Sequence, residues 1–261
     1  MEKILPKKSS LLLQLAIGDV NVTLPRMGDR ILYKTAYEDF KLRMSFVALS
    51  FMGMSLVLNW KGVGHRPLTF LFQVFLVWYY STITLREHIL IANGSKIRSW
   101  WLWHHYLSII VVCLLVIWPN GWAMREFLRG FEWFCFYVAF IQLMEFQYQR
   151  RRMYTLNALG KEDNMRPIGE GVSWNSSLSV LVPFLLFGQV WQLYQGYVLY
   201  ALARDQRCHE WVVPVMSVLM LILGVGNLYT TLTSAKQKFG LLAKARDLPE
   251  LKVVDASAHT P

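Results

Sequence analysis

Charged residues are scarce in this sequence of 261 residues: Asp, Glu, Lys and Arg make up 17%, against about 25% in typical soluble proteins. Cysteine is scarce as well, and two of the three cysteines, Cys113 and Cys135, lie inside apolar runs. A disulfide framework and a thiolate metal site are therefore excluded. The sequence also contains no glycine-rich phosphate loop and no nucleophile elbow.

Apolar residues, in contrast, make up 54% of the chain and gather into long runs. A helix needs about 20 mostly apolar residues to cross about 30 Å of hydrocarbon. Six runs approach or exceed that length: Met44–Trp60, Leu68–Leu85, Trp100–Trp118, Phe131–Gln147, Leu178–Ala203 and Trp211–Leu232. The sequence therefore predicts an all-α membrane protein in which residues 44–232 form a bundle of six transmembrane helices.

The segments that flank these runs mix polar and apolar residues. Within residues 1–43, the stretches Ser9–Gly18 and Ile31–Met44 have the mixture typical of short amphipathic helices at a membrane surface. Residues 233–261 are expected to form a tail, which has no sustained apolar pattern after Gly240 and is predicted to be loose there.

Basic residues predict the topology. The net charge of +10 would suggest nucleic acid as a partner of a soluble protein, but in a membrane protein such an excess usually sets orientation. Of the 27 Lys and Arg residues, 21 fall on alternate segments that share one side of the predicted bundle. By the positive-inside rule both termini are expected in the cytosol, and no nucleic-acid partner is expected.

Polar residues inside apolar runs are costly unless they are paired or face water, so their positions are informative. Such residues recur at helical spacing in the third, fourth and fifth runs, and together with Trp101 they include His104, His105, Glu145, Gln149 and Gln189. On a helix, Trp101, His104 and His105 fall within about 100° of arc. Because these stripes converge on the predicted cytosolic half, we expect a cavity that opens to the cytosol and suits an extended anion.

Each of these features also has a structural interpretation. Trp100 and Trp103 are typical of an interfacial aromatic belt, whereas Trp101 shares the histidine face. The histidine pair and Glu145 are equally compatible with hydrogen bonds between helices, and the basic clusters with topology and lipid headgroup contacts. A metal site is not expected, because His104 and His105 are adjacent and no second histidine box supplies further ligands.

Short motifs spread over nearly the whole chain carry a family resemblance. They include Leu5-Pro-Lys-Lys-Ser9, Gly18-Asp-Val-Asn-Val-Thr23, Val77-Trp-Tyr-Tyr80, Asn93-Gly-Ser95, His104-His-Tyr106, Trp191-Gln-Leu193 and Gln237-Lys-Phe239. In these motifs the sequence resembles the transmembrane protein 120 family, also called TACAN. The resemblance implies a six-span homodimer, similar in fold to very-long-chain fatty acid elongases, in the endoplasmic reticulum, nuclear inner membrane or plasma membrane.

The same resemblance implies a ligand, coenzyme A or acyl-CoA, held in a cytosol-facing cavity. The positions that correspond to coenzyme A contacts are Ser95, Lys96, Trp101, His104 and Lys238, and the polar stripes add His105, Glu145, Gln149 and Gln189 as candidates. Glu145 stands where the family tends to have Gln, and Met216 where relatives have Cys. The cytosolic coiled coil that usually begins family members is expected to be absent.

Elongases carry the acyl group on an imidazole of a His-x-x-His-His box. Here Trp101 takes the first position of that box, which argues against elongase activity and leaves His104 and His105 as candidate catalytic groups. The leading hypothesis is a coenzyme A-binding membrane protein of lipid metabolism, in contact with membrane lipids. The alternatives are a mechanosensitive ion channel and a scaffold of the nuclear envelope or endoplasmic reticulum.

Overall fold

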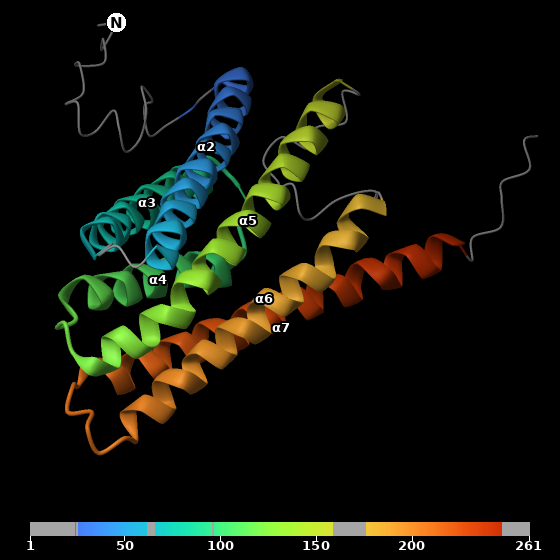
Figure 1. Cartoon of the computed structure of the whole chain (residues 1–261). Helices are drawn as coiled ribbons and strands as arrows, with labels where there is room; N and C mark the ends of the chain where they lie inside the picture. The colour runs from blue at the N-terminus through green and yellow to red at the C-terminus, as the bar shows by residue number, and fades with distance from the viewer. Residues whose placement is uncertain (1–23, 25, 62–65, 96, 159–175, 247–261) are drawn as a thin grey trace, which may run out of the picture.

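The computed structural model describes residue 24 and residues 26–61, 66–95, 97–158 and 176–246, and the regular structure in these ranges is entirely α-helical. Six helices follow one another: α2 (Met27–Trp60), α3 (Arg66–Ala92), α4 (Ser99–Ile117), α5 (Trp122–Ala158), α6 (Ser176–Ala203) and α7 (Val212–Arg246) (Figure 1). Counted over the described residues, five of them are long and apolar enough to cross a membrane: α2, α3, α4, α5 and α7. The all-α membrane fold is confirmed.

All six predicted runs fall on helices, but several helices are longer than the runs. α5 continues past Gln147 to Ala158, and α7 continues to Arg246, into the segment predicted to be loose. The predicted surface helix Ile31–Met44 is the first half of α2, which passes through residues 43 and 44 without interruption. The predicted helix Ser9–Gly18 lies outside the described residues.

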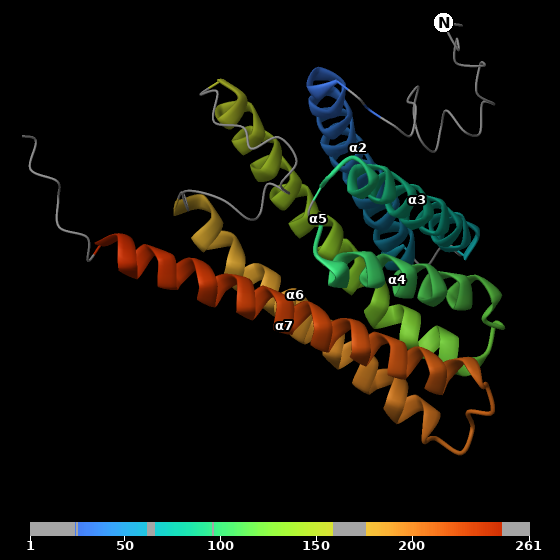
Figure 2. The same cartoon turned by 180° about the vertical axis from the view of Figure 1, so that it is seen from behind.

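The helices run alternately in opposite directions. α2, α4 and α6 begin at the end of the bundle where α3, α5 and α7 finish (Figures 1 and 2). We call this the basic end, because Lys34, Lys41, Arg86, Arg98 and Arg150 lie near it. The other is called the opposite end.

Close packing joins α6 to α7, and α2 to α5. Small residues let the backbones of α6 and α7 approach: a Cβ atom on Gly196 would lie 2.9 Å from the side chain of Leu221, and one on Gly224 would lie 2.7 Å from that of Leu193. Such glycines are common where membrane helices meet, because lipid provides little hydrophobic drive for association and dispersion contacts must supply it.

Candidate functional site

A buried hydrogen-bonded group joins α2, α3 and α4 near the basic end. His105 on α4 lies 3.1 Å from Glu87 Oε1, measured from its Nε2 atom. The hydroxyl of Tyr37 donates to the same carboxylate oxygen at 2.8 Å. Glu87 and Tyr37 are each only 6% exposed, so one buried carboxylate orients a buried tyrosine and a partly buried histidine at once.

Lys41 on α2 extends this group to α5. Its Nζ atom lies 2.8 Å from Glu38 Oε2 and 4.6 Å from the centre of the Tyr37 ring. It also donates to Gln149 Oε1 at 3.3 Å, and Gln149 Nε2 donates to Glu145 at 3.1 Å. The predicted site residues Glu145 and Gln149 are therefore connected to His105 through α2.

His104 belongs to a second group, formed with α6 and α7. It lies beside Asn227, whose side chain accepts from Trp100 Nε1 at 3.0 Å and donates to Gln192 Oε1 at 3.1 Å. Adjacent helical residues point about 100° apart, so the two histidines lead into different polar groups. Their rings still meet edge to face, with centroids 5.4 Å apart.

The three tryptophans that begin α4 have different environments. Trp103 is 63% exposed, as expected for a belt residue. Trp100 differs from the belt interpretation, because it bonds to Asn227 and packs against the Cα atom of Gly226. Trp101 is 37% exposed and contacts His104 edge to face, with centroids 5.8 Å apart. Trp100 is thus an interior residue that packs on α7, whereas Trp103 is a belt residue. The sequence of α4 alone does not reveal this difference.

Several buried polar atoms of this region have no hydrogen-bond partner among the described residues. They are Tyr33 Oη, Glu87 Oε2, the Nδ1 atoms of His104 and His105, and Gln189 Oε1. Buried polar atoms are nearly always satisfied by protein, water or ligand, and leaving one unpaired costs about 1–3 kcal/mol. Five such atoms on α2, α3, α4 and α6 are therefore candidates for hydrogen bonds to water or to a polar ligand.

Basic side chains near this region are held by specific contacts. The Arg86 guanidinium lies 4.1 Å from the centre of the Phe40 ring, and Arg98 Nη1 donates to Ser234 Oγ at 2.7 Å. Arg150 Nε lies 2.9 Å from Asp39 Oδ1. These contacts fix positive charge at the end of the bundle where the unsatisfied atoms lie.

The remaining predicted site residues are placed as follows. Ser95 is half-buried just after α3, and Gln189 donates to Thr231 at 2.6 Å between α6 and α7. Lys96 lies outside the described residues. Lys238 lies on α7, but its side chain is outside the described part of the structure.

Sequence reasoning missed Asn227 and a carboxylate near the opposite end, Glu132. Glu132 is 2% exposed and accepts from Ser55 and Thr69, each at 3.2 Å, and from Asn59 at 3.5 Å. Both residues carry the signal that identified Glu145, a polar side chain inside an apolar run.

Together these features define a multi-pass α-helical membrane protein with a polar interior near one end. Residues 1–241 match the protein family described as TMEM120A/B, and the chain belongs to that family.

Relatives from vertebrates and insects match most of the chain. It is 42% identical to transmembrane protein 120A of Xenopus tropicalis over 243 residues, which cover 92% of this chain and 70% of the relative. It is 40% identical to the transmembrane protein 120 homolog of Drosophila melanogaster over 248 residues, covering 94% of this chain and 63% of that protein. It is also 40% identical to transmembrane protein 120B of Xenopus tropicalis, over 92% of this chain and 71% of the relative.

Proposed function

We propose that this protein binds coenzyme A or acyl-CoA through its basic end, from the cytosol, and acts in lipid metabolism. The observation that carries the proposal is the set of buried, unsatisfied polar atoms on Glu87, His104, His105 and Gln189. A ligand with several hydrogen-bonding groups would satisfy atoms that a purely structural bundle leaves unpaired. The family resemblance names the same ligand.

The residues present fit the chemistry of coenzyme A. Its phosphates would be held by cations at the basic end, where Lys41, Arg86 and Arg98 lie, with Lys238 as the candidate from the resemblance. Its amides would hydrogen bond to the imidazoles of His104 and His105. Coenzyme A, when bound, supplies a thiol that activates acyl groups as thioesters.

The proposal concerns binding rather than chain elongation. His105 is oriented by Glu87, which fixes its Nε2 atom and leaves Nδ1 without a described partner. An imidazole held in this way has one nitrogen available as a base. Trp101 nevertheless occupies the first position of the elongase-like box, so we expect at most slow hydrolysis of acyl-CoA and no condensation with malonyl-CoA.

Native mass spectrometry and titration calorimetry of the purified protein test this proposal. We expect a co-purifying mass that corresponds to coenzyme A, and weaker coenzyme A binding in Arg98→Gln and Lys238→Glu. Arg125→Gln is the matched control, because Arg125 is an exposed cation at the opposite end. Unchanged affinity in the first two variants, or an equal loss in the control, would contradict binding at the basic end.

A further inference from the structure

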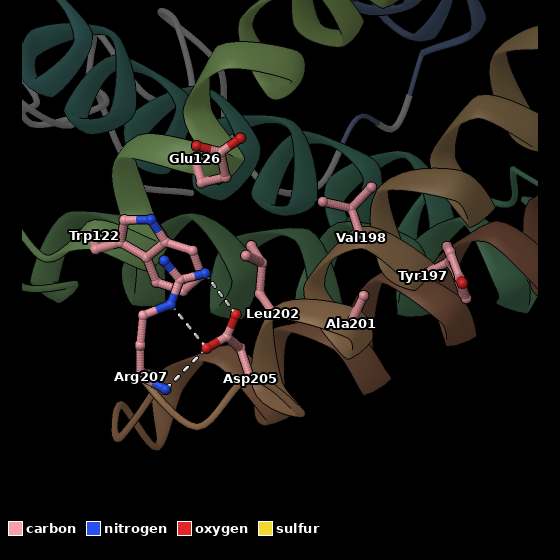
Figure 3. A pocket seen from close by; sticks show the side chains of 8 residues that line it. All are labelled: Trp122, Glu126, Tyr197, Val198, Ala201, Leu202, Asp205 and Arg207. Carbon is pink, nitrogen blue, oxygen red and sulfur yellow. Dashed lines mark hydrogen bonds and ion pairs between the residues drawn. The ribbon is translucent and has the colours of Figure 1, made fainter.

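A hollow of about 480 Å³ lies at the opposite end, remote from the proposed coenzyme A site. It is lined by Trp122, Glu126, Tyr197, Val198, Ala201, Leu202, Asp205 and Arg207 (Figure 3). These residues come from the start of α5, the end of α6 and the segment before α7. Because membrane-crossing helices begin and end here, the hollow lies where lipid headgroups meet acyl chains.

One wall of the hollow is apolar. Val198 and Leu202 lie four residues apart on α6 and therefore on one face, and Ala201 beside them has a side chain too small to fill the space. Tyr197 is 60% exposed beside this wall. An apolar strip that begins among charged groups and continues along a membrane helix suits an acyl chain.

The mouth carries an exposed arginine with two described contacts. Arg207 donates from Nε and Nη2 to the two oxygens of Asp205 at 3.0 and 2.8 Å, and its guanidinium lies 4.0 Å from the centre of the Trp122 ring (Figure 3). The hydrogen bonds from Arg207 lower the pKa of the Asp205 carboxyl to about 2. Guanidinium has five N–H donors, and Asp205 uses only one edge of the fork. Within the described structure the other edge, which includes Nη1, has no acceptor.

We propose that this hollow binds a phospholipid with a primary ammonium headgroup, of the phosphatidylethanolamine type. The free edge of the Arg207 guanidinium receives the phosphate as a bidentate pair. The exposed carboxylate of Glu126, whose Oε1 atom lies 3.8 Å from Arg129, receives the ammonium at its other oxygen. One acyl chain lies along Val198 and Leu202.

Charge distinguishes this lipid from its alternatives. Asp205 neutralises Arg207, and Glu126 lies 3.8 Å from Arg129 on its own helix, so the hollow offers no net positive charge to attract an anionic phosphatidylglycerol. A quaternary choline group has no N–H donor and so cannot hydrogen bond to the Glu126 carboxylate, whereas a primary ammonium has three. An ammonium that hydrogen bonds to a carboxylate is the better complement. The inference does not depend on coenzyme A binding, because it concerns the opposite end.

The test uses the full chain in nanodiscs that contain equal amounts of phosphatidylethanolamine, phosphatidylcholine and phosphatidylglycerol, with native mass spectrometry of the retained lipids. We expect phosphatidylethanolamine to be retained preferentially. Arg207→Gln should reduce its retention about tenfold or more, the effect of losing a charged hydrogen-bond pair. Arg204→Gln is the matched control, since it removes the same charge from the same segment outside the hollow.

Glu126→Gln provides a second test that remains valid if the Arg207→Gln variant does not fold. It should abolish the preference for phosphatidylethanolamine over phosphatidylcholine while leaving total phospholipid retention similar. Equal retention of the three lipids by the unaltered chain would overturn the proposal. So would a preference that survives Glu126→Gln, or a loss in Arg204→Gln as large as that in Arg207→Gln.

Discussion

The contact between Tyr37 and Glu87 makes a quantitative prediction. Tyr37→Phe removes the donor of a 2.8 Å hydrogen bond to a buried carboxylate but keeps the ring that packs between α2 and α3. Hydrogen bonds between membrane helices contribute about 0.6 kcal/mol on average and about 2 kcal/mol at most. Because the acceptor is a carboxylate that retains His105 as its second partner, we expect a loss of about 1–2 kcal/mol.

Glu87→Gln should cost more, about 2–3 kcal/mol. The amide keeps one acceptor oxygen, but it brings two N–H donors into a place where Tyr37 and His105 supply donors already. Leaving a buried donor without an acceptor costs about 1–3 kcal/mol. The double variant, Tyr37→Phe with Glu87→Gln, should be less damaging than the sum of the two, with a coupling of about 0.5–1.5 kcal/mol.

These free energies of unfolding can be measured by steric trapping, with the ligand-free protein unfolding reversibly in bicelles. Tyr194→Phe is the matched control, because Tyr194 is 57% exposed on α6, and we expect almost no change. If the two substitutions are additive within about 0.3 kcal/mol, the hydroxyl and the carboxylate do not interact in the folded protein and the site geometry is refuted.

Gly226→Ala should lower stability by about 1–3 kcal/mol in thermal unfolding, because a Cβ atom there would overlap the Trp100 indole, whereas Gly28→Ala, which faces open space, should not. In a carboxyl NMR titration, Asp205 should titrate near pH 2 and Arg207→Gln should return its pKa toward 3.8. Since the folded pKa is depressed, the stabilisation is present above about pH 4 and is lost as the pH falls toward 2. His104→Ala should reduce the thermal stabilisation by coenzyme A more than it reduces ligand-free stability; equal losses would indicate a structural role alone.

The helices could be predicted from sequence because the bilayer imposes a length that apolar runs must match. Their ends could not. α2 begins at Met27 and α5 continues to Ala158, because a helix that leaves the hydrocarbon keeps its backbone hydrogen bonds and has no reason to stop there. Composition marks the membrane boundary, whereas local propensity and packing decide where a helix ends.

The sequence predicted which types of residue form the site, but it did not predict which of these side chains contact one another. The helical arc that joins Trp101 to His104 and His105 is a property of α4 alone and follows from sequence. That His105 meets Glu87 while His104 meets Asn227 depends on which faces α3 and α7 present, and helical periodicity does not fix those rotations. Asn227 was missed because it is one amide in a strongly apolar run, although its isolation was itself the signal.

The arrangement of polar and apolar layers also bears on the ion-channel alternative. Along α2 and α3, the polar group at Lys41 and Glu87 is separated from the group at Glu132 by an aromatic layer. That layer consists of Phe51, Phe72, Phe75, Trp78 and Tyr79, whose neighbouring rings lie 5.8 to 6.2 Å apart. Lys41 and Ser55 are about 21 Å apart along α2 at 1.5 Å per residue, so the layer fills the middle of the bundle.

The other helices have a similar apolar layer. Leu115, Phe127, Leu199, Val213 and Met216 are almost fully buried in one cluster of α4 to α7, on the side of Asn227 away from the basic end. A conducting pore needs polar or charged groups to replace the hydration of an ion through the whole thickness. These layers consist mainly of packed aromatic and aliphatic side chains, which cannot replace the hydration of an ion. The packing of a single chain therefore argues against a conducting path through it, and conduction would require these layers to separate.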